Sequence, residues 1–328
     1  MRAWDVHGAD MHVLLIGLSS IGTRRVLPAL AAIDEVSSVD IASVSRPSPP
    51  MWPKRGQRFD DYAQALSTSQ ADLVYISLPN AHHERWVLEA LGSGRHVIVD
   101  KPALTSLAGA RQCVELANAK SLLLAEATVF AFHPQIQELQ ALATEMGGLT
   151  HLDALFIIPP LPKDNFRNSA DMGGGCLLDM GPYAAAVARL FGDELETLCA
   201  LAAPSADGAI DKGFSLLAQF QSGLRYTGHF SFESEYQNRL TAIGPCGSAT
   251  IDRVFSPPAE SPLSWQVRLR NDASEIVQPA ADMFEVFFKA VLDAIRSRKL
   301  DEFSSTLLKD AAFRARLERQ LQQGHAND

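Results

Sequence analysis

The sequence predicts an α/β protein with a doubly wound parallel sheet at its N-terminal end and an α+β domain behind it. From residue 12 to about residue 126, short and uninterrupted apolar runs alternate with segments of helical periodicity. That rhythm is typical of a parallel sheet that is buried on both faces. After about residue 130 the strands show alternating apolar and polar positions instead, which indicates a large, mostly antiparallel sheet with one exposed face.

The individual elements follow from these patterns. In the first domain we expect strands at 12–16, 39–45, 72–79, 96–100 and 121–127, and helices at 21–33, 81–94 and 106–120. In the second we expect a helix after 133–134, a strand at 152–158, a helix starting near 173–175, strands between 196 and 270, a hairpin turn at 222–223, and helices at 282–297 and 304–322. The predicted domains are therefore 11–130 and 131–328, with 1–10 as an extension.

Composition excludes several classes of protein. The chain has 328 residues and a formal net charge of −9, which argues against nucleic acid or an anionic membrane as a partner. No apolar run reaches the roughly 20 residues of a membrane span, and the first ten residues lack the apolar core of a signal peptide. The four cysteines are far apart, and no metal-ligand spacing is present. We therefore expect a cytoplasmic enzyme that holds no metal.

A glycine-bearing turn joins the first expected strand to the first helix. It reads Gly-Leu-Ser-Ser-Ile-Gly from Gly17 to Gly22, and a Rossmann loop would carry a third glycine at Ser19. Serine is small, and its hydroxyl could bond a phosphate oxygen, so the strand–turn–helix context favours a dinucleotide site. The alternative is a βα turn that binds no nucleotide.

The end of the second expected strand bears on which dinucleotide binds. An acidic residue there is typical of NAD sites, but Asp40 lies at the start of this strand, and its end carries Ser45 and Arg46. A hydroxyl and a guanidinium suit the 2′-phosphate of NADP(H), which we therefore favour over NAD(H). The alternative is that Arg46 is a solvated loop charge.

Three further residues predict carbonyl chemistry. Lys101 follows the strand 96–99 and is held by Pro102, at the sheet edge where ligands of such folds bind. Asp179 and Tyr183 are four residues apart, so a helix places them on one side. A nearby ammonium group lowers the pKa of a tyrosine, which makes Tyr183 a workable proton donor to a carbonyl beside Lys101. Taken singly, a surface lysine and a half-buried core tyrosine are the alternatives.

These motifs resemble the glucose–fructose oxidoreductase/inositol dehydrogenase (Gfo/Idh/MocA) family over nearly the whole chain. The matching segments are IGLSSIGTRRVLPAL, VYISLPNAHHERWVLEALGSGRHVIVDKPALTS, EATVFAFHPQ, DNFRNSADMGGGCLLDMGPY and GPCGSATIDRVFSPP. Within the family, the loop IPPLPKDNFRNSADMGGG and the segment RVFSPPAE are similar to sugar-nucleotide 3-ketoreductases. Three positions depart from the family pattern: Ser19 replaces a glycine, Asp100 replaces a glutamate before the Lys-Pro pair, and Ala131 stands where many members carry arginine.

The resemblance implies a role for each matched position. The pyrophosphate is expected at Gly17, Ser19, Ser20, Ile21 and Gly22, and the ribose phosphate at Ser45 and Arg46. Leu78, Pro79, Asn80, His83 and Lys101 are expected to line the cofactor, and Glu126 and Arg167 to approach its nicotinamide end. For His83 and Arg167, surface positions are the alternatives. The implied catalytic residues are Lys101, Tyr183 and Asp179, the last holding the substrate or the lysine.

The resulting prediction is an NADP(H)-dependent oxidoreductase that reduces a sugar carbonyl, first of all the 3-keto group of a nucleotide-linked keto-deoxysugar. Lys163 and Arg167 supply positive charge for such a substrate. A dehydrogenase that oxidises a free sugar or diol, and a non-catalytic dinucleotide-binding sensor, are the alternatives. The polar positions Arg225, Thr227, His229 and Ser231 predict a wet interface on the open sheet face, hence a homodimer or homotetramer.

Overall fold

The computed structural model describes residues 10–44, 54–270 and 272–324, and these form two compact units. The first unit contains the described residues up to Ala127 together with Phe284–Leu308, and the second contains Thr128–Met283 together with the chain from Lys309 on. The predicted domains assigned everything after residue 130 to the second domain. The structure differs because Phe284–Leu308 returns to the first unit, where Phe288 packs on Tyr75 and Arg296 pairs with Glu35.

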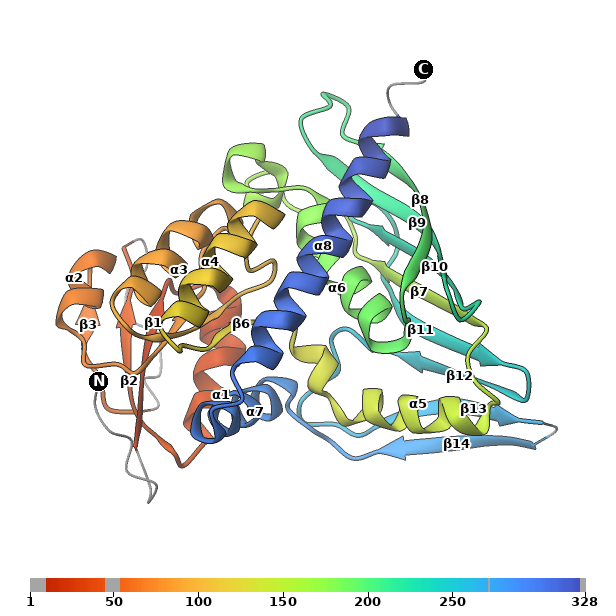
Figure 1. Cartoon of the computed structure of the whole chain (residues 1–328), viewed down its shortest axis with the longest axis horizontal. Coiled ribbons are helices and arrows are strands. Elements are labelled where there is room, and N and C mark those ends of the chain that lie inside the picture. The colour runs from red at the N-terminus through yellow and green to blue at the C-terminus, as the bar shows by residue number, and fades with distance from the viewer. Residues whose placement is uncertain (1–9, 45–53, 271, 325–328) are drawn as a thin grey trace. The chain divides into compact units, whose positions relative to one another are not determined.

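The first unit is built on a six-stranded parallel sheet (Figure 1). Its strand order is β3-β2-β1-β4-β5-β6, which is the doubly wound order that the sequence predicts. The strands are β1 (Met11–Ile16), β2 (Val36–Ala42), β3 (Arg58–Phe59), β4 (Leu73–Ile76), β5 (His96–Val99) and β6 (Leu124–Glu126). Strands β1, β4 and β5 are buried almost throughout, as the uninterrupted apolar runs indicate.

Helices cover both faces of this sheet (Figure 1). Helices α3 and α4 pack against each other on one face, while α1 and α7 lie on the other, as right-handed crossovers require. The helical segments of the unit are a π-helical turn (Gly22–Val26), α1 (Leu27–Ala31), α2 (Tyr62–Thr68), a 3₁₀ turn (Asn80–His82), α3 (His83–Gly92), α4 (Leu107–Ala119) and α7 (Met283–Ser297). The sequence analysis missed β3 and α2, although Asp61 caps α2 by accepting the Gln64 N–H.

The first helix departs from regular α geometry because of a proline. Pro28 has no N–H and cannot donate to the carbonyl four residues earlier. The helix meets this constraint by opening as a π-helical turn, in which the Leu27 N–H bonds the Gly22 carbonyl five residues back. The segment directly after the glycine turn is therefore wider than an ordinary helix.

The second unit is built on an eight-stranded sheet of order β14-β13-β12-β11-β7-β10-β9-β8. Its neighbouring strands are antiparallel except for β7 and β10, which pair in parallel. The strands are β7 (His151–Ile157), β8 (Leu195–Pro204), β9 (Asp211–Phe220), β10 (Arg225–Ser231), β11 (Gln237–Gly244), β12 (Gly247–Asp252), β13 (Leu263–Leu269) and β14 (Asp272–Gln278). The tight connection at Ser222–Gly223 joins β9 to β10, with Gly223 at positive φ, as predicted.

Helix α6 (Cys176–Phe191) covers one face of this sheet, packing on β9 and β10. Five further helical segments complete the unit: α5 (Pro134–Glu145), the latter part of α8 (Asp301–Gly324), and short 3₁₀ turns at Val129–Phe132, Phe166–Asn168 and Ala170–Met172. The bidentate pair of Arg189 with Asp310 joins α8 to α6, with Nε–Oδ1 at 2.8 Å. Among the described residues, no helix has the length and apolar character needed to cross a membrane.

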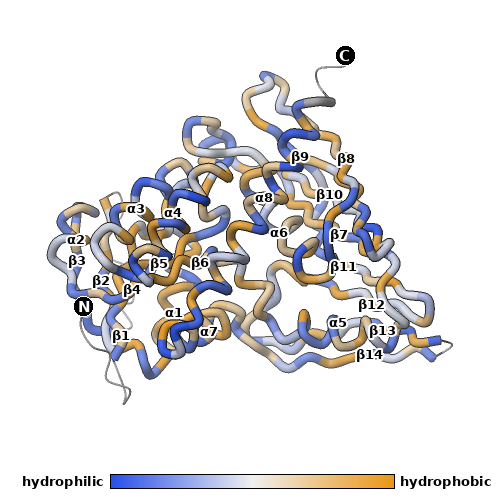
Figure 2. Tube along the Cα trace, in the orientation of Figure 1, coloured by the Kyte–Doolittle hydropathy of each residue, from blue (hydrophilic) through white to orange (hydrophobic). Residues whose placement is uncertain are grey.

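The face of the eight-stranded sheet opposite to α6 is open to solvent. Leu201 and Leu217 are 74% and 50% exposed, and Arg225 and Thr227 are also exposed. Ser231, which the sequence analysis placed on this face, is buried at the end of β10, where its hydroxyl accepts the Glu233 N–H. Figure 2 shows polar and apolar residues in alternation along the strands of the second unit.

We expect the protein to lose stability as the pH falls from 6.5 to about 4, because of His96. Burial lowers the pKa of His96 from 6.5 to about 4, and its Nδ1 accepts the Leu123 N–H. In this pH interval the unfolded chain binds a proton that the folded chain does not, so the free energy of unfolding falls by up to about 1.4 kcal/mol per pH unit. Urea unfolding at pH 7 and pH 5 measures this slope. His96→Asn, which keeps an acceptor for Leu123, should flatten it; an unchanged slope would contradict the assignment.

Candidate functional site

The turn after β1 has the backbone geometry that a dinucleotide loop needs. Gly17 has φ +87°, and a Cβ built there would lie 2.3 Å from the carbonyl oxygen of Ser77, so only glycine fits. Ser20 and Ile21 are exposed beyond this turn, and Gly22 opens the first helix. A turn bounded by two glycines before a helix N-terminus is a suitable cradle for a pyrophosphate, so the residues present fit a dinucleotide.

Ser19 uses its hydroxyl within the protein. Its Oγ lies 2.7 Å from the Oγ of Ser77 and accepts the Gly22 N–H at 2.9 Å. The sequence analysis suggested a phosphate oxygen as the partner of this hydroxyl. The structure gives it two protein partners instead, one of them the Gly22 N–H, so the remaining backbone N–H groups of the loop are the donors for a phosphate.

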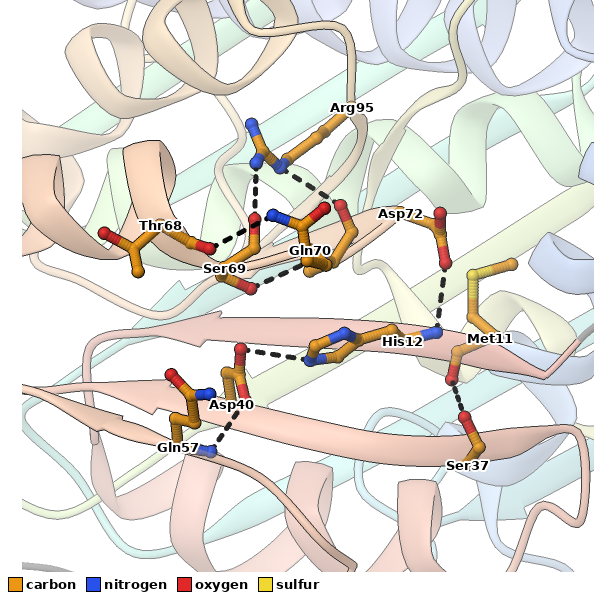
Figure 3. Close-up of polar contacts among 11 residues, drawn as sticks. Met11, His12, Ser37, Asp40, Gln57, Thr68, Ser69, Gln70, Asp72 and Arg95 are labelled. Atoms are coloured by element: carbon orange, nitrogen blue, oxygen red, sulfur yellow. Dashed lines mark hydrogen bonds and ion pairs between the residues drawn. The ribbon is translucent and has the colours of Figure 1, made fainter. Parts of the chain in front are cut away.

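Asp40 is unavailable to a ribose. It is the fifth residue of β2, which begins three residues earlier than predicted, and it is 2% exposed. Its carboxylate lies 3.0 Å from Nε2 of His12 and accepts the Gln57 N–H at 2.7 Å (Figure 3). Burial acts to raise the pKa of Asp40, but these hydrogen bonds outweigh burial and the net shift is downward. Ser45 and Arg46, the predicted ribose-phosphate residues, lie outside the described residues.

Lys101 follows β5 at the carboxyl edge of the parallel sheet, and it is partly exposed. The Lys101–Pro102 peptide bond is cis. On one side of Lys101, the Asp100 carboxylate accepts hydrogen bonds from Tyr75 and Ser77, each at 2.6 Å. On the other side, Glu126 accepts the Ala103 N–H at 2.7 Å. The backbone on both sides of the lysine is therefore anchored to neighbouring strand ends.

His83 is a buried positioning residue. Its side chain is inaccessible, and its ring nitrogens lie 2.8 Å from the carbonyl oxygens of Pro102 and Leu78. The ring thus joins the end of β4 to the Lys-Pro segment, and the surface-histidine alternative is wrong. Leu78 and Pro79 are partly exposed at the same edge, whereas Asn80 is buried.

In the second unit the structure brings together Arg167 and Asp179. The Nε of Arg167 lies 2.8 Å from Oδ1 of Asp179, and the two side chains are 28% and 8% exposed. The glycines before α6 make this approach possible. A Cβ on Gly174 would lie 2.5 Å from the Arg167 carbonyl oxygen, and Gly175 has φ +103°. Asp179, expected to hold the substrate or the lysine, therefore has an arginine partner that the sequence analysis did not assign to it.

Tyr183 lies one helical turn after Asp179 and is partly exposed. Three aromatic rings pack around its ring, those of Phe156, Phe255 and Phe130, with centroid distances of 5.0, 5.3 and 5.6 Å. An aromatic collar of this kind fixes the direction of the phenol. Among the described residues, no group of three or more His, Cys, Asp or Glu side chains is arranged to hold a metal ion.

Sequence reasoning missed Tyr75 and Ser77. Both come from the end of β4, beside the carboxyl ends of β1 and β5 in the sheet order. Since the carboxyl ends of parallel strands meet at one edge, a small polar residue directly after β4 was a signal that could have found Ser77.

Comparison with known proteins agrees with this geometry. Residues 11–128 match the model of an oxidoreductase family with an NAD-binding Rossmann fold, and residues 136–250 match the Gfo/Idh/MocA C-terminal domain. The chain belongs to the Gfo/Idh/MocA oxidoreductase family. Its predicted fold class, a Rossmann domain followed by a domain with a mostly antiparallel sheet, is confirmed.

Several similar proteins act on sugars. The chain is 32% identical to dTDP-3,4-didehydro-2,6-dideoxy-alpha-D-glucose 3-reductase from Actinomadura kijaniata, over 92% of this chain and 93% of the relative. It is 28% identical to D-xylose 1-dehydrogenase (NADP(+)) 2 from Haloferax volcanii, over 70% and 73% of the two chains.

The fold is also that of a solved ketoreductase. The structure of KijD10, a 3-ketoreductase from Actinomadura kijaniata in complex with NADP and TDP-benzene, matches with a TM-score of 0.89 and 31% identity, covering 95% of this chain and 98% of the other. Further structures of that reductase carry a tyrosine-to-phenylalanine or a lysine-to-alanine substitution.

We expect Gly17→Ala to disrupt the loop strongly, because the new methyl group meets the Ser77 carbonyl and the residue retains a positive φ. Strain at such a position costs about 1–3 kcal/mol before the clash is counted. Gly92→Ala in α3 is the matched control, since a Cβ there meets nothing within 4 Å. Urea unfolding of both variants tests this; equal stability of the two would refute the assigned role of Gly17.

Proposed function

We propose that the protein is an NADPH-dependent ketoreductase that reduces the 3-keto group of a nucleotide-linked keto-deoxysugar. One observation carries the proposal: the chain combines a dinucleotide loop, a Lys101 whose neighbour Asp100 is hydrogen-bonded, and a Tyr183 packed among aromatic rings. Over nine-tenths of its length, this chain is similar to a dTDP-sugar 3-reductase. The similarity to a reductase with bound NADP and TDP-benzene supports both the cofactor and the nucleotide on the substrate.

The cofactor would be held by the glycine turn and the strand ends around it. The backbone N–H groups of Ser19, Ser20 and Ile21 would bind the pyrophosphate. Gly17 and Gly22 would let it approach the turn, because their own N–H groups bond the Ala42 carbonyl and Ser19 Oγ. Ser45 with Arg46 would bind the 2′-phosphate. Leu78, Pro79, Asn80, Glu126 and Arg167 remain predicted neighbours of the cofactor. His83 would act through the Leu78 and Pro102 carbonyls that it holds. When bound, NADPH supplies the hydride for the reduction.

The chain's own part of the chemistry is to orient the carbonyl and to manage one proton. Tyr183 would donate its phenolic proton to the oxygen that becomes the hydroxyl group. Lys101 would hydrogen-bond the same oxygen and favour the tyrosinate that remains. The Asp179 carboxylate lies against Arg167, so it would hold that arginine in a fixed direction toward the substrate.

Two other functions remain as alternatives. Similarity to a D-xylose 1-dehydrogenase favours oxidation of a free sugar as the second candidate, and kinetics in both directions separate it from the ketoreductase. A non-catalytic sensor would bind the cofactor tightly and turn over no carbonyl substrate.

We also propose that the open sheet face is the surface for self-association into a homodimer or homotetramer. The exposed Leu201 and Leu217 lie beside the polar Arg225 and Thr227 on this face. Light scattering of the wild type and of Leu217→Asp tests this, with a fall in mass expected for the variant.

Lys101→Ala and Tyr183→Phe should each lower kcat by about 10²–10⁴-fold on a dTDP-3-keto-deoxysugar, because each removes a partner of the reacting oxygen. NADPH affinity should fall less than kcat in Tyr183→Phe. Lys120→Ala is a control, because its ammonium group donates to the Gly92 carbonyl at the exposed end of α4. Wild-type turnover in both variants would refute the assignment.

NADPH should bind at least tenfold more tightly than NADH, about 1.4 kcal/mol. Arg46→Ala should remove most of that preference by weakening NADPH alone, because NADH has no 2′-phosphate. Fluorescence titration of both cofactors measures it, with Arg111→Ala on the exposed side of α4 as the matched control. Equal loss for NADPH and NADH would place Arg46 elsewhere.

A further inference from the structure

A chain of hydrogen bonds runs from the dinucleotide loop to the residue before Lys101. The Gly22 N–H bonds Ser19 Oγ at 2.9 Å, and Ser19 Oγ lies 2.7 Å from Ser77 Oγ. Ser77 Oγ bonds Asp100 Oδ2 at 2.6 Å, and the hydroxyl of Tyr75 bonds Asp100 Oδ1 at 2.6 Å. The loop and the Lys-Pro strand end are thus joined by side chains as well as by the backbone pairing of β1, β4 and β5.

The direction of every bond in this chain is fixed. A carboxylate only accepts, so Ser77 gives its single hydroxyl proton to Asp100. Ser19 must therefore donate to Ser77 while its own oxygen accepts from Gly22. Burial, followed by the Asp100 carboxylate, raises the pKa of Tyr75 well above its ordinary value, which keeps its hydroxyl a donor. Bonds aligned in one direction polarise and strengthen one another.

The two ends of this chain, Ser19 and Asp100, each depend on the length of one side chain. A glycine at 19 would remove the first hydroxyl of the chain. A glutamate at 100 would lengthen the side chain by one methylene group. Its carboxylate would then not fit the two 2.6 Å hydrogen bonds from Ser77 and from the fully buried Tyr75. Both side chains are therefore matched to the same hydroxyl, that of Ser77.

We propose that Ser19 and Asp100 are a matched pair, joined through Ser77, that couples the state of the dinucleotide loop to the position of Lys101. The three are positioning residues. The inference rests on the proposed function in that it gives Lys101 a catalytic role and the loop a cofactor. Filling the loop then fixes Ser19, and through Ser77 and Asp100 it fixes the backbone that carries the lysine.

Ser19 and Asp100 are not in direct contact along this chain, so coupling between them needs a carrier, and the Ser77→Ala background tests whether that carrier is Ser77. The test is a double-mutant cycle of Ser19→Gly and Asp100→Asn, read out as the dissociation constant of NADPH or NADH, whichever the wild type binds more tightly. Asp100→Asn should weaken binding about five- to tenfold when Ser19 is present and less than twofold in the Ser19→Gly background. The Ser77→Ala background should likewise abolish the effect of Asp100→Asn.

Ser67→Ala is the matched control, because the Ser67 hydroxyl makes one exposed bond, to the Gln64 carbonyl, on α2. Combined with Asp100→Asn, it should give additive effects. Equal effects of Asp100→Asn in all backgrounds would overturn the pair, as would a lowered Tm with unchanged cofactor affinity, which is the signature of a purely structural chain. Cofactor binding needs no sugar substrate, so failure of the keto-sugar assay leaves this cycle readable. Failure of the wild type to bind either cofactor overturns both the proposed function and the pair.

Discussion

The close approach of the Gly17 turn to the carbonyl of Ser77 is the constraint on which the first unit depends. It brings the end of β1 against the end of β4 with no room for a side chain between them. The same approach places Ser19 beside Ser77, whose hydroxyl links it to Asp100. A single missing Cβ thus sets the geometry of the loop and of the strand end that carries Lys101. Tyr75 and His83 then hold that strand end from two further sides.

The second unit solves a different problem, which is to hold charged groups in a largely apolar setting. Asp179 is nearly buried at the start of α6, and leaving it unpaired would be costly. The glycine run before the helix lets the chain fold back so that Arg167 reaches that carboxylate. Tyr183 follows in an aromatic collar that restrains the ring. Rigid placement of a few polar groups by apolar neighbours is what the proposed reductive site requires, because water competes for every one of them.

The sequence predicted the parallel sheet well because its strands are buried on both faces and leave an unmistakable apolar pattern. The sequence patterns did not reveal β3 and α2, which are too short to show a periodicity. They also placed the start of β2 three residues too late, because Ser37 and Ser38 interrupt the apolar run. The motif residues Lys101, Asp179 and Tyr183 were accessible as local patterns. The contact of Ser19 with Ser77 joins positions 58 residues apart, and the pairing of Arg167 with Asp179 joins positions 12 residues apart. No local pattern contains such contacts.

The return of Phe284–Leu308 to the first unit has a consequence for how such chains can be rearranged. Phe288 packs on Tyr75, and Tyr75 donates a hydrogen bond to Asp100, the residue before Lys101. A fragment that ends at Ala127 would therefore lack the ring that packs on Tyr75. Helix α8 then continues from Leu308 into residues that count with the second unit. The two units are therefore interleaved in the gene rather than consecutive. Recombination that exchanges one of them between homologues must carry two separate stretches of coding sequence, and a single crossover near residue 128 would produce a mismatched core.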